Sequence, residues 1–135
     1  MPVYNGERYI GGALDSLIAQ DYPHWELIIS DNASTDRTVE VCQAYAYRDE
    51  RIQLVRQAVN RGASWNFGFV RDAARGSCFM WAAHDDLWSP NYISACLTLL
   101  LESKHHALCC TPVTFIDELG QHLQRPFRNL ESRGL

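Results

Sequence analysis

Two adjacent carboxylates follow a strongly apolar run of the chain, in the sequence His84-Asp85-Asp86. Carboxylates beside a buried strand repel each other, and a hard divalent cation relieves that repulsion. Mg²⁺ and Mn²⁺ prefer oxygen ligands and often complete their coordination with substrate phosphates. The pattern therefore indicates a metal–diphosphate site, although a loop whose aspartates cap a turn before Ser89-Pro90 would show the same residues.

A second polar pair, Asp31-Asn32, ends another apolar run. Both side chains accept hydrogen bonds and Asn32 also donates, so the pair can bind a base edge or ribose hydroxyls. Residues 33–35 open a predicted helix whose first amides can receive an anion. An Asx turn leading into a helix cap explains these residues without a ligand. Arg61 can bind a phosphate with its forked donors, although a turn arginine is more often simply solvated.

Other chemistries find less support in the sequence. It has no G-x-G-x-x-G and no Walker lysine, which argues against dinucleotide-binding and P-loop proteins. The five cysteines, without a C-x-x-C pair, predict buried free thiols in a reducing cytoplasm rather than disulfides or a zinc site. We interpret His105-His106 as following a helix C-terminus, where histidine is favourable, and the tryptophans as core residues.

Alternating helices and strands must position these polar residues. The alternation predicts an α/β fold with a mostly parallel central sheet of about five strands and helices on both faces. Ligands bind at the carboxyl ends of the strands in such sheets, where the polar sets above would lie. The run 78–83 is typical of a central strand, and 52–57 of an edge strand. The expected strands are 1–4, 25–30, 52–57, 78–83 and 107–116, and the expected helices are 9–18, 34–48, 63–74 and 91–103.

The composition fits one globular domain. Of 135 residues, 47% are apolar and 21% are charged, and the net charge is -4. This excludes disordered and collagen-like chains and argues against general binding to nucleic acid or anionic membranes. No apolar run is long enough to span a bilayer, and residues 1–8 do not form a signal peptide.

The order of the motifs resembles the family 2 glycosyltransferases of the GT-A fold. That family shows P-x-Y-N, then L-x-S-L-x-x-Q-x-Y, then E-(I/L)-(I/V)-(I/V)-x-D-(D/N)-x-S-x-D-x-T, as residues 2–38 do here. The stretch NRGASWNFGFVRDAARGSCFMWAAHDDLWSP, residues 60–90, resembles the family's N-x-G…A-x-G segment and its aspartate motif. The match covers most of the chain, from Met1 to about Ser103.

The resemblance implies a Rossmann-like GT-A sandwich, truncated at both ends. Residues 1–117 would be the nucleotide-sugar-binding domain, with an incomplete first strand, and 118–135 the start of an acceptor region or an irregular tail. Asp31-Asn32 would contact the nucleobase, and Asp85 would be the last carboxylate of the D-x-D motif. The residues assigned to the nucleotide-sugar are Pro2, Tyr4, Glu7, Asp31, Asn32, Arg61, His84 and Asp85, and those assigned to the metal are Asp85 and Asp86.

Two positions depart from the family pattern. Asn32 stands at the second acidic position and carries no charge, which bears on the identity of the donor. Ala83 replaces the first aspartate of D-x-D, so that metal binding relies on Asp85, with Asp86 or His84 replacing the ribose contact. We interpret this as a changed site rather than an inactive one.

The expected function is transfer of a sugar from a nucleotide-diphosphate sugar, a UDP-sugar first among the candidates, to a hydroxyl of a carbohydrate or lipid-linked acceptor. Mn²⁺ or Mg²⁺ would neutralise the leaving diphosphate. The resemblance implies envelope polysaccharide synthesis in the cytoplasm, peripheral to the inner face of the membrane. No residue matches the family's general base, so the acceptor half is expected outside this chain. The alternatives are a nucleotide-binding module without catalysis and a flavodoxin-like regulatory domain.

Overall fold

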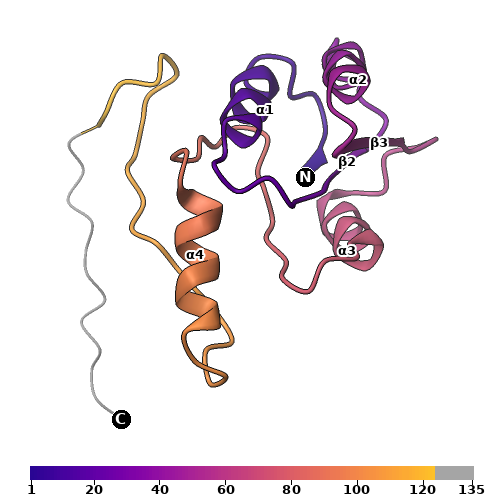
Figure 1. Ribbon diagram of the computed structural model, residues 1–135. Helices are drawn as coiled ribbons and strands as arrows, with labels where there is room; N and C mark the ends of the chain where they lie inside the picture. The colour runs from indigo at the N-terminus through magenta and orange to yellow at the C-terminus, as the bar shows by residue number, and fades with distance from the viewer. Residues whose placement is uncertain (124–135) are drawn as a thin grey trace. The chain divides into compact units, whose positions relative to one another are not determined.

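The computed structural model describes residues 1–123, in two compact units, Met1–Ala95 and a second that begins at Cys96. The first unit alternates strands and helices, as the sequence predicts (Figure 1). Helix α4 begins in the first unit and continues into the second. The elements are β1 (Pro2–Val3), α1 (Ile10–Ile18), β2 (Leu27–Asp31), α2 (Thr38–Arg48), β3 (Ile52–Arg56), α3 (Ala63–Ala73) and α4 (Tyr92–Leu101).

The strands form a parallel sheet in the order β1-β2-β3. Figure 1 shows α1 and α2 on one face of this sheet and α3 on the other, which confirms the predicted layers. Every residue of β2 is buried, as its central place requires, whereas β3 at the sheet edge buries Ile52 alone and exposes Gln53 and Arg56. The parallel arrangement brings the ends of β1 and β2, at Val3 and Asp31, into register.

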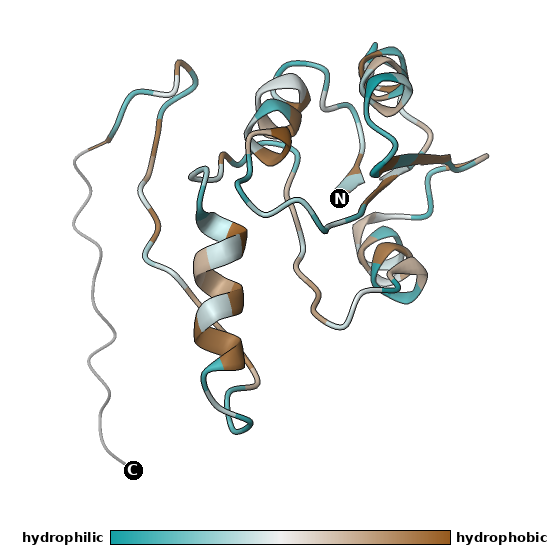
Figure 2. Cartoon of the chain, viewed as in Figure 1, coloured by the Kyte–Doolittle hydropathy of each residue, from teal (hydrophilic) through white to brown (hydrophobic). Residues whose placement is uncertain are grey.

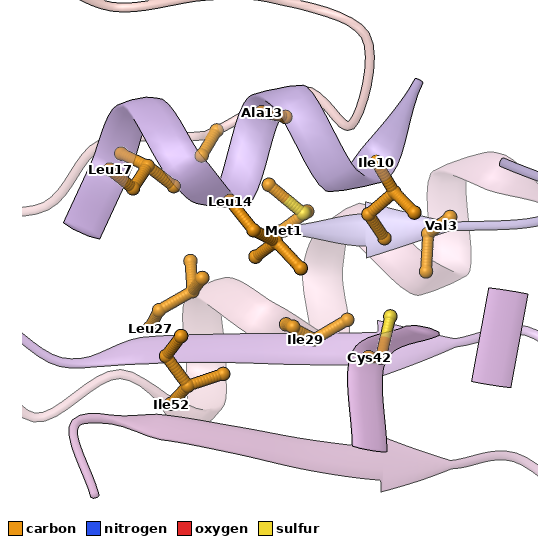
Figure 3. Packing of buried hydrophobic residues seen from close by; sticks show 11 residues of the cluster. Met1, Val3, Ile10, Ala13, Leu14, Leu17, Leu27, Ile29, Cys42 and Ile52 are labelled. Atoms are coloured by element: carbon orange, nitrogen blue, oxygen red, sulfur yellow. The ribbon is translucent and has the colours of Figure 1, made fainter. Parts of the chain in front are cut away.

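The core of the first unit lies between α1 and the sheet. Ile10, Leu14 and Leu17 recur at helical spacing and are buried against β2, where Ile29 is fully buried (Figure 3). Truncation of Leu14 to alanine in such a core costs about 2–5 kcal/mol. This packing fixes α1, and with it the loop that precedes α1, against the sheet.

Two predicted strands do not form within the described residues. The segment 78–83 forms no strand, and Phe79 and Trp81 are 44% and 51% exposed although Ala82 is buried. The reason is the lack of a partner, because β1 contributes just two residues to the sheet. The sheet of the described part therefore has three strands instead of about five.

The predicted strand 107–116 is reduced to a single bridge between Ile116 and His122. Pro112 lacks the amide that a sheet requires, and Asp117 closes a turn instead, since its Oδ1 accepts hydrogen bonds from the amides of Leu119 and Gln121 at 2.9 and 2.8 Å. The boundary predicted after residue 117 falls inside the second unit and stays a prediction, and the tail from residue 124 lies outside the described residues.

The second unit exposes much apolar surface. Figure 2 shows hydrophobic residues along the last turn of α4, where Leu99 and Leu101 are exposed. His106 donates from Nδ1 to the carbonyl of Leu99 at 2.7 Å, which confirms that histidine binds the carboxyl end of this helix. No helix among residues 1–123 has the length and hydrophobicity to cross a membrane.

None of the five cysteines, all within the described residues, forms a disulfide, and their predicted burial is wrong in part. Cys42 is buried in the core, whereas Cys78 and Cys110 are exposed. Cys78 lies in the unpaired segment 78–83, so the absent strand explains its exposure.

Candidate functional site

Two loops at the ends of β1 and β2 are fastened to each other by Asn5. Its amide donates to Oγ of Ser34 at 2.9 Å, and its Oδ1 accepts the amide of Thr35 at 2.9 Å. Asn5 and Ala33 both have positive φ, 51° and 63°. Asparagine tolerates this conformation, but in alanine it costs roughly 1–2 kcal/mol. Such stored strain at strand ends is typical of binding loops.

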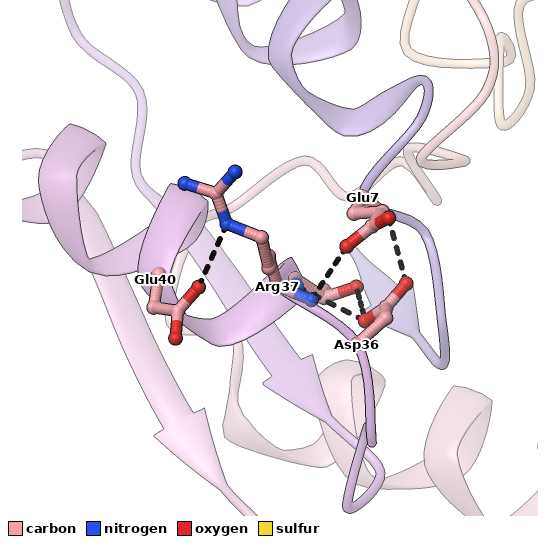
Figure 4. Close-up of polar contacts among 5 residues, drawn as sticks. Glu7, Asp36, Arg37 and Glu40 are labelled. Atoms are coloured by element: carbon pink, nitrogen blue, oxygen red, sulfur yellow. Dashed lines mark hydrogen bonds and ion pairs between the residues drawn. The ribbon is translucent and has the colours of Figure 1, made fainter.

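The start of α2 is bonded to acidic side chains of the chain itself (Figure 4). The amide of Arg37 donates to Oε2 of Glu7 at 2.7 Å, and the amide of Glu7 donates to Oδ2 of Asp36 at 3.2 Å. Burial opposes ionisation of Asp36, but hydrogen bonds from Thr38 and Glu7 outweigh it and lower the pKa of Asp36. Glu7, predicted to face the ribose, therefore also secures the loop to α2.

Asp31, the last residue of β2, is a buried carboxylate with a free oxygen. The residue is 1% exposed, and its Oδ2 accepts the amide of Ser34 at 3.1 Å. Its Oδ1 has no hydrogen-bond partner among the described residues. An unpaired buried oxygen is costly, and a donor from a ligand would relieve that cost.

The charge of Asp31 affects the thiol of Cys42, but Cys42 is not a nucleophile. Burial, with a smaller contribution from the charge of Asp31, raises the pKa of Cys42 to about 12. The thiol therefore stays protonated at neutral pH, and thiolate chemistry is excluded there.

Asn32 holds the turn that follows β3. Its Nδ2 donates to Oδ1 of Asn60 at 2.9 Å and to the carbonyl of Gly62 at 3.2 Å, and its Oδ1 accepts the amide of Arg61 at 3.0 Å. Asn32 is 2% exposed. Both hydrogens of its amide are thus used within the protein, which gives the residue a structural task beside the predicted base contact.

Arg61 is exposed in this turn, with its guanidinium carbon 4.5 Å from the centroid of the Trp65 ring. Trp65 in turn stacks on Phe69 at 5.4 Å between centroids. Stacking limits the orientations of the guanidinium while leaving its edge free for hydrogen bonds. Arg61 can therefore present a forked donor to a phosphate.

The turn at residues 84–86 carries the predicted metal ligands. Asp85 and Asp86 are exposed, and His84 is half-buried. Among residues 1–123 no group of three or more His, Cys, Asp or Glu side chains is arranged to hold a metal ion. Two hard carboxylates nevertheless fit Mg²⁺ or Mn²⁺, which commonly take their remaining ligands from phosphates and water.

The remaining predicted residues lie on β1 and just after it. Pro2 is buried and pairs with Ser30 in the sheet, whereas Tyr4 is 45% exposed just after the strand; the predicted nucleotide contact of Pro2 stays a prediction. Sequence reasoning missed Asn66 of α3, whose buried Nδ2 donates to the carbonyl of Ser30 at 2.9 Å. In the sequence, Asn66 is recognisable just as a polar residue on the inward face of a predicted helix.

Comparisons with known proteins agree on one family. A family model described as "Glycosyl transferase family 2" matches residues 1–133. Putative glycosyltransferase EpsE from Bacillus subtilis (strain 168) is 30% identical over 121 residues, 89% of this chain and 44% of that protein. The putative teichuronic acid biosynthesis glycosyltransferase TuaG of the same strain is 35% identical over 101 residues, 75% of this chain and 40% of that protein. The chain thus spans less than half the length of these curated relatives.

Solved structures give the same result. TarS 1-349 from S. aureus, in complex with UDP, matches with a TM-score of 0.70 and 25% identity over 75% of this chain and 30% of that one. The mannosyltransferase PcManGT from Pyrobaculum calidifontis, in complex with GDP-Man and Mn2+, matches with a TM-score of 0.67 and 27% identity over 73% of this chain and 30% of that one. These matches confirm the predicted GT-A fold class.

Proposed function

Since this chain belongs to glycosyl transferase family 2, we propose that it binds the nucleotide-diphosphate sugar, with residues 1–117 as the donor-binding domain. The family match decides against a flavodoxin-like regulatory domain. Two structural neighbours, one with UDP and one with GDP-Man and Mn2+, support a nucleotide-sugar and a divalent cation as ligands. A UDP-sugar is the donor we propose first.

The unpartnered Oδ1 of Asp31 is the observation that carries the proposal. It lies at the carboxyl end of the central strand, where α/β sheets bind ligands. A carboxylate there suits the N–H of a pyrimidine base, since an ionised acid only accepts. We propose that the base reaches Asp31 between the Asn5 and Asn32 loops, with Asn32 ordering the turn beside it.

The other predicted residues would contact the remaining parts of the donor, namely its base, ribose, phosphates and bound cation. We propose that Tyr4 and Glu7 face the base and the ribose, and that Arg61 binds phosphate oxygens. Asp85 and Asp86 would hold Mn²⁺ or Mg²⁺ on the diphosphate, where the cation neutralises charge on the leaving group. Carboxylates that leave most of the coordination sphere open suit a cation whose other ligands are substrate phosphates.

We propose a carbohydrate or lipid-linked hydroxyl as acceptor, in cell-envelope polysaccharide synthesis at the inner face of the membrane. The relative TuaG, named as a putative teichuronic acid biosynthesis glycosyltransferase, supports this setting. No residue of the chain is proposed as general base. Asp117 already accepts the amides of Leu119 and Gln121 and closes a turn.

Calorimetric titration with UDP, with and without Mn²⁺, tests the proposal. Wild type is expected to bind UDP more tightly with Mn²⁺, and Asp85→Ala is expected to lose that gain. Asp31→Ala is expected to weaken UDP binding under both conditions. Asp72→Ala, which removes an exposed carboxylate paired with Arg71 on α3, is the matched control and should bind like wild type. Equal binding by all four proteins would refute the site.

A nucleotide-binding module without catalysis is the second candidate. Its support is that no residue of the sequence matches the family's general base. Incubation of this chain with labelled UDP-sugar and a panel of glycan acceptors decides between the two. Labelled glycan product would exclude the module, and donor binding without product would favour it.

A further inference from the structure

A packing contact at Gly6 joins the two parts of the proposed donor site. Gly6 is buried in the loop between β1 and α1, and the edge of the His84 ring rests against it. A Cβ at Gly6 would lie 2.5 Å from Cδ2 of His84 and 2.8 Å from Cγ2 of Val3, too close for either to remain in place. The φ of Gly6 is not positive, so space rather than backbone conformation requires glycine here.

The backbone of Gly6 is fixed from both sides. Its amide donates to Oγ1 of Thr38 at 2.8 Å, and Thr38 is fully buried at the start of α2. Its carbonyl accepts the amides of Tyr9 and Ile10 at 3.1 and 3.0 Å, which begin α1. Because the backbone of Gly6 cannot shift away from His84 without breaking these hydrogen bonds, an added Cβ would displace the His84 ring.

The residues after His84 rest along α1. The amide of Trp88 donates to Oγ of Ser16 at 3.2 Å, and Leu87 approaches Gly12, where an added Cβ would lie 3.6 Å from its Cδ2. The turn that bears Asp85 and Asp86 is thus held by His84 on one side and by residues 87 and 88 on the other. Displacement of His84 would release the first of these attachments.

We propose that Gly6 is a positioning residue for the carboxylates of Asp85 and Asp86. By leaving room for His84, it sets the distance between the loop proposed to hold the nucleoside and the turn proposed to hold the cation. A nucleoside diphosphate has a second phosphate that the cation would bind, whereas a monophosphate lacks it. The contact therefore makes the site selective for nucleoside diphosphates. This inference rests on the proposed function.

The test is calorimetric titration of Gly6→Ala with UDP and with UMP, both in Mn²⁺. We expect UDP affinity to fall about tenfold or more, equivalent to about 1.4 kcal/mol, while UMP affinity stays within about twofold. Gly12→Ala is the matched control, since a Cβ at this α1 residue would make an ordinary contact, 3.6 Å from Cδ2 of Leu87, with the same segment that carries His84. It should keep the wild-type ratio of UDP to UMP affinity.

His84→Ala provides a second variant, because it removes the ring that Gly6 accommodates. It should lose the same selectivity, and Gly6→Ala/His84→Ala should lose no more than either change alone, since both act through one contact. If Gly6→Ala fails to fold, the UDP-to-UMP ratio of His84→Ala decides.

Two results would overturn the inference while leaving the proposed function intact. One is wild-type affinity for both UDP and UMP in both single variants. The other is a parallel loss of UDP and UMP affinity, which would mean a general loosening of the loop. Failure of wild type to bind UDP with Mn²⁺ would instead refute the proposed function, and the inference with it.

Discussion

The replacement Asn32→Asp restores the acidic pair common in the family, and we expect it to destabilise this protein. The Nδ2 group of Asn32 lies 2.9 Å from Oδ1 of Asn60 and 3.2 Å from the carbonyl of Gly62. A carboxylate would place an acceptor opposite two acceptors at a position that is 2% exposed. Asn60 cannot simply rotate its amide to compensate, because its Oδ1 also accepts the amide of Gly62 at 2.8 Å.

The magnitude follows from the bonds lost. Two hydrogen bonds contribute about 1 kcal/mol each, and an unpaired buried group costs a further 1–3 kcal/mol, so the expected loss at pH 7 is about 3–5 kcal/mol. For a chain of this length that lowers the melting temperature by about 10–20 °C. The turn that carries Arg61 should loosen as well, because Asn32 is its main attachment.

The variant's pH dependence separates this explanation from simple loss of packing. Burial and the facing acceptors should raise the folded-state pKa of the introduced carboxyl above its ordinary value of about 3.9. The protonated acid can donate one hydrogen bond, so the loss should shrink as pH falls toward 4. Asn32→Ala removes the same bonds without a charge, and its loss should not change with pH. Urea denaturation followed by circular dichroism at pH 7 and pH 4.5 measures both. Wild-type stability of Asn32→Asp at pH 7 would refute the reasoning.

Three further predictions concern the same fold. Burial lowers the pKa of the Met1 amine from 8.0 to about 5. Between these pH values the unfolded chain binds a proton that the folded chain does not, so the free energy of unfolding should fall by up to about 4 kcal/mol from pH 8 to pH 5. Urea titrations on a chain whose mass confirms Met1 measure this, and a flat profile would contradict it. With Ellman's reagent, Cys78 and Cys110 should react at once and Cys42 only after unfolding; early labelling of Cys42, identified by mass spectrometry, would contradict its burial. Glu7→Ala removes a cap of α2 and should lower stability by about 1 kcal/mol, whereas Glu7→Gln should recover most of it; equal melting temperatures for all three proteins would count against the cap.

Local patterns in the sequence predicted most of the first unit. The apolar stripe through Ile10, Leu14 and Leu17 identifies α1, and the run before Asp31 identifies the central strand, because both follow from burial on a single element. The segment 78–83 could not be predicted in the same way. Its apolar residues suit a strand, but a strand also needs a partner with free hydrogen-bonding groups, which is a property of the sheet and not of the segment.

The candidate site shows the same division. The sequence places Asp31, Arg61 and Asp85 at strand ends. The structure has Asp31 at the end of β2 and Arg61 in the loop after β3, whereas Asp85 lies in a turn after a segment that forms no strand. The sequence cannot show that the amide of Asn32 is already bonded within the protein, because those partners come from a turn 28 residues away. The contact of Gly6 with His84 is equally long-range, and a glycine required for space has no local signature.

Anomalous diffraction from crystals of this chain grown with UDP and Mn²⁺ tests the central claim most directly. We predict a manganese peak between the carboxylates of Asp85 and Asp86 and the diphosphate, with the uracil hydrogen-bonded to Asp31. A manganese peak and a nucleotide bound elsewhere on the chain, with Asp31 and Asp85 untouched, would contradict it.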